Sequence, residues 1–316
     1  MTMPPPGRRI PLDPDRSGGS QPVPEPLLTT LADGRRIVVR QAGTGVPIVL
    51  LHGFPLDHTM WDAQWALVAA GGALDGSARL IAPDLAGFGG SDGPTASSIA
   101  GMADEVVAIL DALGCHEPVV ACGLSMGGYV VQHLAARHPD RLRGIVLVDT
   151  KLEADTPAAR AGRVDLSERV GRWGARIAAE ALVPRLLAPR LLAPRLLSLG
   201  SGRSALETRL RETIQQTAVA TIRTALAALG DRPDMTAAAT GFGQPTLLVV
   251  GAEDGITPPE CLERAAAVIR HAELEIVAGC GHMTPMEDPT AFNTRLASFL
   301  RERVVTAPPA RPRGAP

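Results

Sequence analysis

Two segments of the chain carry the pattern Gly-x-Ser-x-Gly, which in many proteins exposes a serine that can act as a nucleophile. One is centred on Ser125 and the other on Ser91. Ser125 directly follows the short apolar run 119–124, which is typical of a buried strand, and apolar residues recur at helical spacing from Met126 onward. Ser91 lies instead in a glycine-rich loop, several residues beyond the preceding predicted strand. A tight strand-to-helix turn holds its middle residue at the end of a sheet, so Ser125 is the candidate nucleophile; the alternative is a serine that only caps the helix.

A serine hydroxyl becomes a nucleophile when a base removes its proton, and the base needs an orienting carboxylate. The chain order serine, acid, histidine places both partners downstream of Ser125. His282 stands in a glycine-flanked loop after the last predicted strand, so it is the candidate base. Asp254, in the loop after the predicted strand 244–250, is the candidate acid, although it could instead cap the following helix. Asp149, at the end of an earlier strand, is a rival acid, and Glu253 is a third candidate.

Acyl transfer also needs N–H donors aimed at the developing oxyanion. The backbone N–H of Met126, next to the candidate nucleophile, is one such donor. The second is expected from the loop after the predicted strand 46–51, where Phe54 is the best placed. In the same loop, His52 is expected to make a structural hydrogen bond. Of the remaining histidines, His133 and His138 are predicted to be packing or surface residues. Surface positions in loops or at helix ends are predicted for His58, His116 and His271.

The composition limits the possible functions. The 316 residues are 45% hydrophobic, enough for one large core domain with or without an insertion. A net charge of −2 provides no basic field for nucleic acid or an anionic membrane, and 3% aromatic residues argue against a base-stacking surface. Four cysteines without zinc spacing, no secretory signal and no membrane-spanning run predict a reduced, cytoplasmic protein. No metal, cofactor, nucleic-acid or membrane partner is therefore expected, and the oligomeric state is left open.

Apolar strands alternate with amphipathic helices over residues 27–149 and again over residues 241–303. Such alternation predicts an α/β fold in which a mostly parallel sheet is covered by helices on both faces. Strands are expected at residues 35–41, 46–51, 79–85, 119–124, 144–148, 244–250 and 274–277.

Residues 150–240 show helical patterns only, which predicts a helical cap inserted between two strands. Within this region, Pro-Arg-Leu-Leu occurs three times in the segment 184–197. Prolines that frequent cannot sit in one continuous helix, so short, broken helical turns are expected there. The segments 1–26 and 304–316 are predicted to be disordered tails, the first because it is rich in proline and glycine.

From about residue 27 to residue 303 the chain resembles the α/β-hydrolase family. The motifs that match, in the family's order, are His52-Gly53-Phe54-Pro55, the loop 84–91, the turn 123–127, the loop around Asp254 and the pair Gly281-His282. The resemblance implies an α/β-hydrolase fold with a cap and no cofactor. It also implies that Ser125 is the nucleophile, His282 the base and Asp254 the acid, with Phe54 and Met126 as oxyanion donors.

Within that family, residues 52–57 together with Met60 and Trp61 are similar to 3-oxoadipate enol-lactonases and small carboxylesterases. This implies cleavage of a small carboxylic ester or lactone through an acyl-enzyme. The segment is also similar to cofactor-free perhydrolases, so a perhydrolase or a C–C bond hydrolase using the same triad is an alternative. A non-catalytic ligand-binding member of the fold is another. Apolar cap residues are expected to wall the pocket between cap and strand ends, among them Leu186, Leu187, Leu191 and Leu192.

Overall fold

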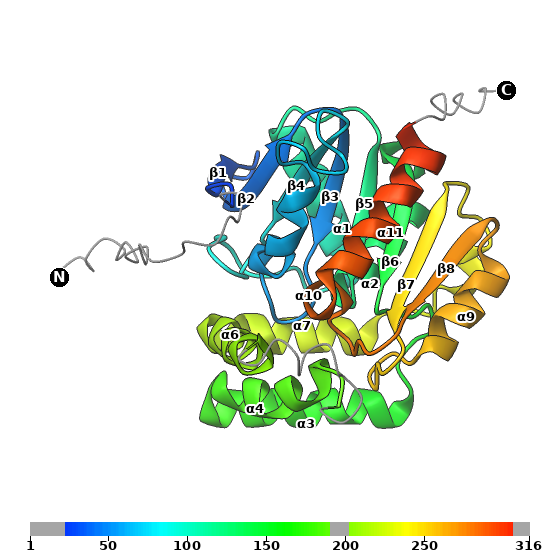
Figure 1. Ribbon diagram of the computed structural model, residues 1–316. Coiled ribbons are helices and arrows are strands. Elements are labelled where there is room, and N and C mark those ends of the chain that lie inside the picture. Colours follow the sequence, from blue (N-terminus) through cyan, green and yellow to red (C-terminus); the bar gives the residue numbers. More distant parts are fainter. Residues whose placement is uncertain (1–22, 190–201, 306–316) are drawn as a thin grey trace, which may run out of the picture.

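The computed structural model describes residues 23–189 and 202–305, and within them eight strands form one sheet (Figure 1). Their order across the sheet is β1-β2-β4-β3-β5-β6-β7-β8. The pairs β1–β2 and β2–β4 are antiparallel, and all other neighbours are parallel. The strands are β1 (Leu27–Thr30), β2 (Arg36–Gly43), β3 (Val46–Leu51), β4 (Ala78–Pro83), β5 (Val119–Leu124), β6 (Leu142–Val148), β7 (Thr246–Gly251) and β8 (Ala272–Val277).

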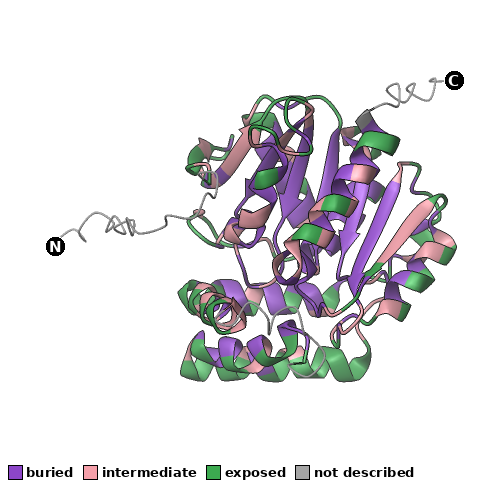
Figure 2. Ribbon diagram, in the orientation of Figure 1, coloured by how far each residue is buried: buried purple, intermediate pink, exposed green. Residues whose placement is uncertain are grey.

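Helices cover both faces of the sheet, as the alternating pattern predicts, and the central strands are buried (Figure 2). Because successive side chains of a strand point to opposite faces, Ile48 and Leu50 pack with η1 and α11, whereas Val49 and Leu51 pack with α1, α2 and α9. These elements are η1 (His58–Leu67), α1 (Ile99–Ala112), α2 (Met126–Arg137), η2 (Pro139–Arg141), α9 (Pro259–Val268), α10 (Thr284–Glu287), α11 (Pro289–Phe299) and η4 (Leu300–Val305).

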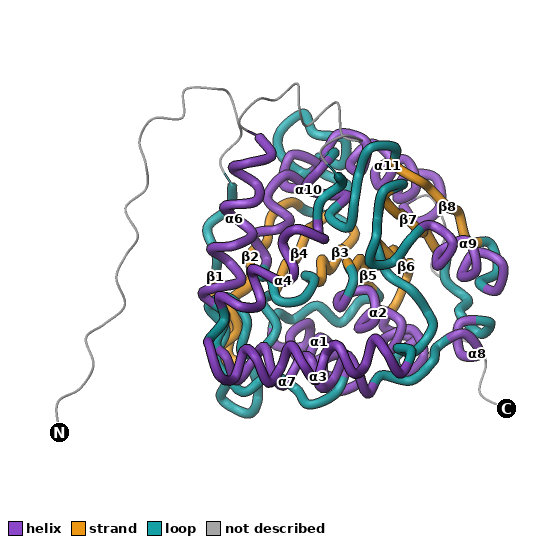
Figure 3. Tube along the Cα trace, turned by 90° about the horizontal axis from the view of Figure 1, so that it is seen from below, coloured by secondary structure: helices purple, strands orange, loops and turns teal. Residues whose placement is uncertain are grey.

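Between β6 and β7 the described chain is helical, as expected for an inserted cap, and four of these helices lie together along one edge of the sheet (Figures 1 and 3). Two contacts identify that edge as the one where the parallel strands end. Thr217 Oγ1 donates to the carbonyl of Pro55 after β3, at 3.2 Å, and the His282 N–H after β8 donates to the carbonyl of Leu186, at 2.9 Å. The four are α3 (Pro157–Trp173), α4 (Arg176–Leu186), α6 (Gly202–Gln216) and α7 (Val219–Asp231), whereas α8 (Thr236–Ala239) packs against α2 and α9 of the core.

The proline-rich segment differs from expectation at its start. Helix α4 continues through Pro184 and ends at Leu186, after which Leu187 is extended (φ −106°, ψ 149°). The proline removes one backbone donor close to the helix end, so only two residues follow it in the helix. The predicted broken turns at 190–197 lie outside the described residues, as do residues 1–22 and 306–316 of the predicted tails. No helix in the described part of the chain combines the length and the apolar character that a bilayer crossing requires.

A buried arginine ties the two ends of the cap to the core. Arg232, after α7, pairs with Asp155, before α3, at 2.7 Å, and both side chains are only 2% exposed. The same guanidinium donates to the carbonyl of Glu153 at 3.0 Å and lies 4.0 Å from the ring centroid of Tyr129 on α2. Although burial raises the pKa of Asp155, Arg163 and Arg232 outweigh it and lower that pKa to about 2. Both chain crossings into the cap therefore meet at one charged junction.

We predict that Arg232→Ala lowers the free energy of unfolding by about 3–5 kcal/mol, because it leaves Asp155 with part of its buried charge uncompensated. Denaturant unfolding followed by circular dichroism measures this change. The matched control is Arg160→Ala, which breaks an exposed pair with Asp231 and is expected to change stability by less than about 1 kcal/mol. Equal losses in the two variants would contradict a special role for Arg232.

Candidate active site

The turn between β5 and α2 holds Ser125 in a backbone conformation that side-chain-bearing residues rarely adopt, with φ 53° and ψ −110°. Its N–H donates to the carbonyl of Val148 at the end of β6 (2.9 Å), and its own carbonyl accepts from Thr150 Oγ1 (3.0 Å). A Cβ atom on Gly123 would lie 2.2 Å from the carbonyl of Gly127, so the turn closes too tightly for a side chain at that position. The sharp turn predicted around Ser125 is thus present, anchored to the neighbouring strand.

The backbone N–H groups predicted to bind an oxyanion lie around this turn. Met126 is the first residue of α2, so its N–H is among those that have no acceptor within the helix. The loop after β3 packs against the turn, because a Cβ on Gly53 would lie 3.7 Å from Ser125 Cβ, and Phe54 follows directly. His52 anchors this loop as expected: its Nδ1–H donates to the Gly53 carbonyl (3.0 Å) and its Nε2 accepts from Leu85 N–H (3.1 Å).

The structure brings His282 and Asp254 into direct contact. The Nδ1–H of His282 donates to Asp254 Oδ2 at 2.7 Å, with the histidine only 2% and the aspartate 2% exposed. Asp254 also accepts from Thr257 Oγ1 (2.7 Å) and from the backbone N–H groups of Ile256 (2.8 Å) and Thr257 (3.0 Å). The carboxylate of Asp254 therefore bonds within its own loop. The N-cap residue of α9 is Pro258, and no side chain makes a capping hydrogen bond there.

These contacts shift both pKa values. Burial raises the pKa of Asp254, but His282 and the Thr257 donors outweigh it, so the pKa is below its usual range. Burial lowers the pKa of His282, but the attraction of Asp254 and its hydrogen bond, with smaller contributions from Asp149 and Glu287, raise it above 6.5. The pair thus keeps Asp254 ionised and stabilises a proton on the imidazole.

The rival acid, Asp149, is fully buried directly after β6, and its oxygens accept hydrogen bonds from donors other than the imidazole. Oδ1 accepts from Gly251 N–H and Thr284 Oγ1, and Oδ2 accepts from Thr284 N–H, all at 3.0 Å. Burial and the charge of Asp254 raise the pKa of Asp149 to about 7. In this arrangement Asp149 joins the loops after β7 and β8. Glu253, the third candidate, uses its backbone N–H to bind the carbonyl of Cys280.

The second serine of the pattern is structural. Ser91 Oγ donates to the carbonyl of Asp84 (2.7 Å) and accepts from the N–H of Val38 (2.9 Å). Of the remaining histidines, His133 is buried on α2, His138 pairs with Asp104, and His116 is exposed. The prediction that His58 is a surface residue is wrong. It is only 7% exposed because its partner Asp84, distant in sequence, draws it into the core.

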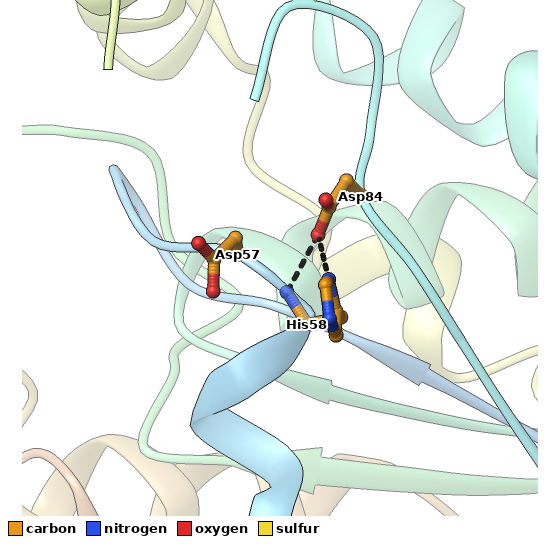
Figure 4. A group of neighbouring side chains, drawn as sticks. All are labelled: Asp57, His58 and Asp84. Atoms are coloured by element: carbon orange, nitrogen blue, oxygen red, sulfur yellow. Dashed lines mark hydrogen bonds and ion pairs between the residues drawn. The ribbon is translucent and has the colours of Figure 1, made fainter. Parts of the chain in front are cut away.

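Among the described residues, Asp57, His58 and Asp84 bring metal-ligand atoms within 4.8 Å of one another (Figure 4). Asp84 already accepts from His58 N–H (2.7 Å), His58 Nδ1–H (2.7 Å) and Gly90 N–H (3.0 Å). Although burial raises the pKa of Asp84, the hydrogen bonds and charge of His58, together with His52, hold it below its ordinary value. The cluster is therefore accounted for as a junction between the loops after β3 and β4.

Two polar residues near the candidate base, Thr257 and Glu287, were not predicted from the sequence. Thr257 donates to Asp254, and its Oγ1 lies 3.3 Å from His282 Nδ1. Glu287 accepts hydrogen bonds from the N–H groups on either side of His282. Neither residue belongs to a glycine-flanked turn or directly follows a strand, so no local pattern distinguishes them.

A doubly covered, mostly parallel sheet, a strained serine turn and a buried Asp–His pair at one sheet edge define the α/β-hydrolase class. Residues 46–289 match the family described as "alpha/beta hydrolase fold", and this chain belongs to it, as the sequence resemblance implied.

Two relatives and one fold neighbour give the family context. A thermophilic esterase from Thermogutta terrifontis superposes with a TM-score of 0.79 at 32% identity, over 90% of this chain and 100% of that one. The 2-hydroxymuconate semialdehyde hydrolase of Pseudomonas sp. strain CF600 is 29% identical over 86% of this chain and 93% of its own length. An enol-lactonase from Burkholderia xenovorans LB400 shares the fold, with a TM-score of 0.76 at 24% identity, over 87% of this chain and 100% of that one.

We predict that Gly123→Ala disrupts the serine turn, because the added methyl group would overlap the Gly127 carbonyl. Overpacking of this kind lowers the free energy of unfolding by roughly 1–3 kcal/mol. The control is Gly162→Ala in α3, where a Cβ meets nothing within 4 Å, and which should gain up to about 1 kcal/mol in stability. Thermal unfolding of both variants tests the prediction, and a fully stable Gly123→Ala protein would contradict it.

Proposed function

We propose that this protein is a cofactor-free serine hydrolase that cleaves a small carboxylic ester or lactone through an acyl-enzyme. The observation that carries the proposal is the 2.7 Å hydrogen bond from His282 Nδ1–H to Asp254, both buried beyond the ends of β8 and β7. It assigns the Nδ1 proton to the carboxylate side and leaves Nε2 as the proton acceptor. Ser125, directly after β5, lies at the same edge of the sheet, because the carboxyl ends of parallel strands lie together.

In this mechanism, Ser125 Oγ attacks the carbonyl carbon of the substrate while His282 Nε2 takes the hydroxyl proton. The N–H groups of Phe54 and Met126 stabilise the oxyanion of the tetrahedral intermediate. Collapse of that intermediate expels the alcohol, which receives the proton from His282, and leaves the acyl group on the serine. Water, activated by the same imidazole, then releases the acid and regenerates Ser125.

Two kinds of similarity support an ester or lactone as the substrate. The relative from Thermogutta is an esterase, and the residues from His52 to Asp57 are similar to lactonases and small esterases. The buried cap residues Leu186 and Leu187 provide an apolar wall near the His282 loop. Leu191 and Leu192, predicted as further wall residues, lie outside the described residues.

A C–C bond hydrolase is the second candidate, favoured by the Pseudomonas relative, whose name assigns it a semialdehyde substrate. The same serine, histidine and aspartate would serve both reactions, so the products distinguish them. An ester or lactone hydrolase releases an alcohol or hydroxy acid from an oxygen leaving group, whereas the other reaction separates two carbon fragments.

Ser125→Ala is expected to lower turnover of p-nitrophenyl esters by roughly 10⁴-fold or more and to abolish labelling by a fluorophosphonate probe, because the nucleophile is removed. The control is Ser91→Ala, the other serine of the Gly-x-Ser-x-Gly pattern, which should retain activity and labelling. Initial rates and probe labelling, with circular dichroism as a check of folding, give the result. Undiminished turnover in folded Ser125→Ala would rule out the proposed nucleophile.

Asp254→Asn should lower kcat by roughly 10⁴-fold, because an amide facing Nδ1 favours the tautomer that leaves no acceptor at Nε2. Asp149→Asn changes the contacts of Gly251 and Thr284 and removes a charge that does not bond the imidazole, so it should cause a smaller loss. Steady-state kinetics of both variants on one ester decides between the two carboxylates. A larger loss in Asp149→Asn would assign the acid to the end of β6.

A further inference from the structure

One buried carboxylate holds both sides of the candidate base. Glu287, in the short helix α10, is only 6% exposed. Its Oε1 accepts from the N–H of Gly281 at 2.8 Å and from the N–H of Met283 at 3.2 Å, the residues immediately before and after His282. Its Oε2 accepts from the N–H of Ala188 in the cap at 2.8 Å. The side chain of Glu287 therefore connects the His282 loop to the cap.

The cap backbone lies directly against this loop. The N–H of His282 donates to the carbonyl of Leu186 at 2.9 Å. A Cβ on Gly281 would lie 2.4 Å from the nitrogen of Ala188, so only glycine allows the two backbones to approach this closely. Arg203 of α6 donates to the carbonyl of Ala188. Burial raises the pKa of Glu287 above its usual range, while the three backbone donors and the charge of Arg203 act in the opposite direction and favour the ionised form. The segment 186–188 is thus bound to the His282 loop by hydrogen bonds in both directions.

We propose that Glu287 is a positioning residue that clamps the His282 loop to the cap segment 186–188, so that the base is in place only while this segment is docked. The function assigned to His282 rests on the proposed hydrolase activity, whereas the clamp itself rests on the contacts above. Glu287 does not touch the reacting atoms. It acts by fixing the backbone on both sides of the imidazole.

An ionised carboxylate is the group that fits this position, because three N–H donors face its two oxygens. In Glu287→Gln the amide oxygen can serve the two donors of the loop, but the amide NH₂ then faces the N–H of Ala188. If the amide is reversed, its NH₂ faces the donors of Gly281 and Met283 instead. Either orientation opposes donor to donor, so the substitution releases one side of the clamp while preserving the shape of the side chain.

The charge of Glu287 provides a second readout. Three acidic side chains act on the His282 imidazole and raise its pKa: Asp254, Asp149 and Glu287. The neutral imidazole is the base, so activity falls as the pH drops through this pKa. Removing the charge of Glu287 lowers the pKa of His282, which moves the acid limb of the kcat/KM profile to lower pH.

The test compares Glu287→Gln with Glu105→Gln. Glu105, on α1, is equally buried, at 6% exposure. It accepts from the N–H of Ala86 at 2.7 Å and from Arg35, which directly precedes β2, near the end of the strand order opposite to β8. We expect Glu287→Gln to lower kcat by between about tenfold and a hundredfold, with little change in KM and with the acid limb displaced to lower pH. Glu105→Gln should keep the wild-type kcat and pH profile.

Hydrogen–deuterium exchange provides a readout independent of catalysis. Peptides spanning residues 183–189 and 278–289 should exchange faster in Glu287→Gln and at the wild-type rate in Glu105→Gln. If the wild-type protein is inactive on esters, the proposed function fails, but the exchange comparison still tests the clamp. Faster exchange in both segments of Glu287→Gln then supports the clamp. Unchanged exchange in segment 183–189 overturns the clamp whatever the activity.

Glu287→Asp keeps the charge but shortens the side chain by one methylene, so that it cannot reach the loop and the cap together. It also serves as the test protein if Glu287→Gln does not fold. We expect kcat to fall while the acid limb stays at its wild-type pH, because geometry is lost and charge is retained. A folded Gln or Asp variant with wild-type kcat overturns the positioning role.

Discussion

The structure around the site depends on supplying hydrogen-bond donors to buried carboxylates. Removing an ionised carboxylate from water costs several kcal/mol unless donors or opposite charge surround it. Asp149, Asp254 and Glu287 are all buried near the end of the sheet where the parallel strands finish. Asp149 accepts from the end of β7 and the start of α10, Asp254 from its own turn and the His282 loop, and Glu287 from the His282 loop and the cap. These segments therefore cannot be arranged independently. The donors are Gly251 and Thr284 for Asp149, Ile256, Thr257 and His282 for Asp254, and Gly281, Met283 and Ala188 for Glu287.

The same arrangement explains why the carboxylates differ in character. Asp254 has the imidazole as its partner and keeps a low pKa, whereas burial and the nearby charge of Asp254 raise the pKa of Asp149 to about 7. The negative charges together favour a proton on His282, which is the state that the proposed mechanism creates when the serine attacks. Asp149 therefore carries the unfavourable pKa shift, while Asp254 stays ionised beside the imidazole.

Much of the core could be predicted from the sequence because a strand buried on both faces has a continuous apolar run. Strands β3 and β5 have the predicted bounds, and the turn that follows β5 carries its own glycine signal. Strand β1 has no such signal, since Leu28 at the sheet edge is 61% exposed. The 3₁₀ helix η1 was also not expected from the sequence.

The site was predictable only where a residue stands in a recognisable turn. Ser125, Asp254 and His282 follow strand ends, so the topology places them at one edge before any contact is known. The burial of His58 depends on Asp84, 26 residues away, and the role of Glu287 depends on Ala188, 99 residues away. Contacts of that separation arise from the packed fold, and no local spacing encodes them.

The contact between the cap and the His282 loop uses backbone groups of the cap and a specific side chain of the core. The bonds that hold the loop use the carbonyl of Leu186 and the N–H of Ala188, which are backbone groups that most residues could supply. The side chain that must be specific is Glu287, and it belongs to the core. The hydrogen bonds to the loop therefore place no requirement on the side chains of residues 186–188, which are constrained instead by their burial in the core.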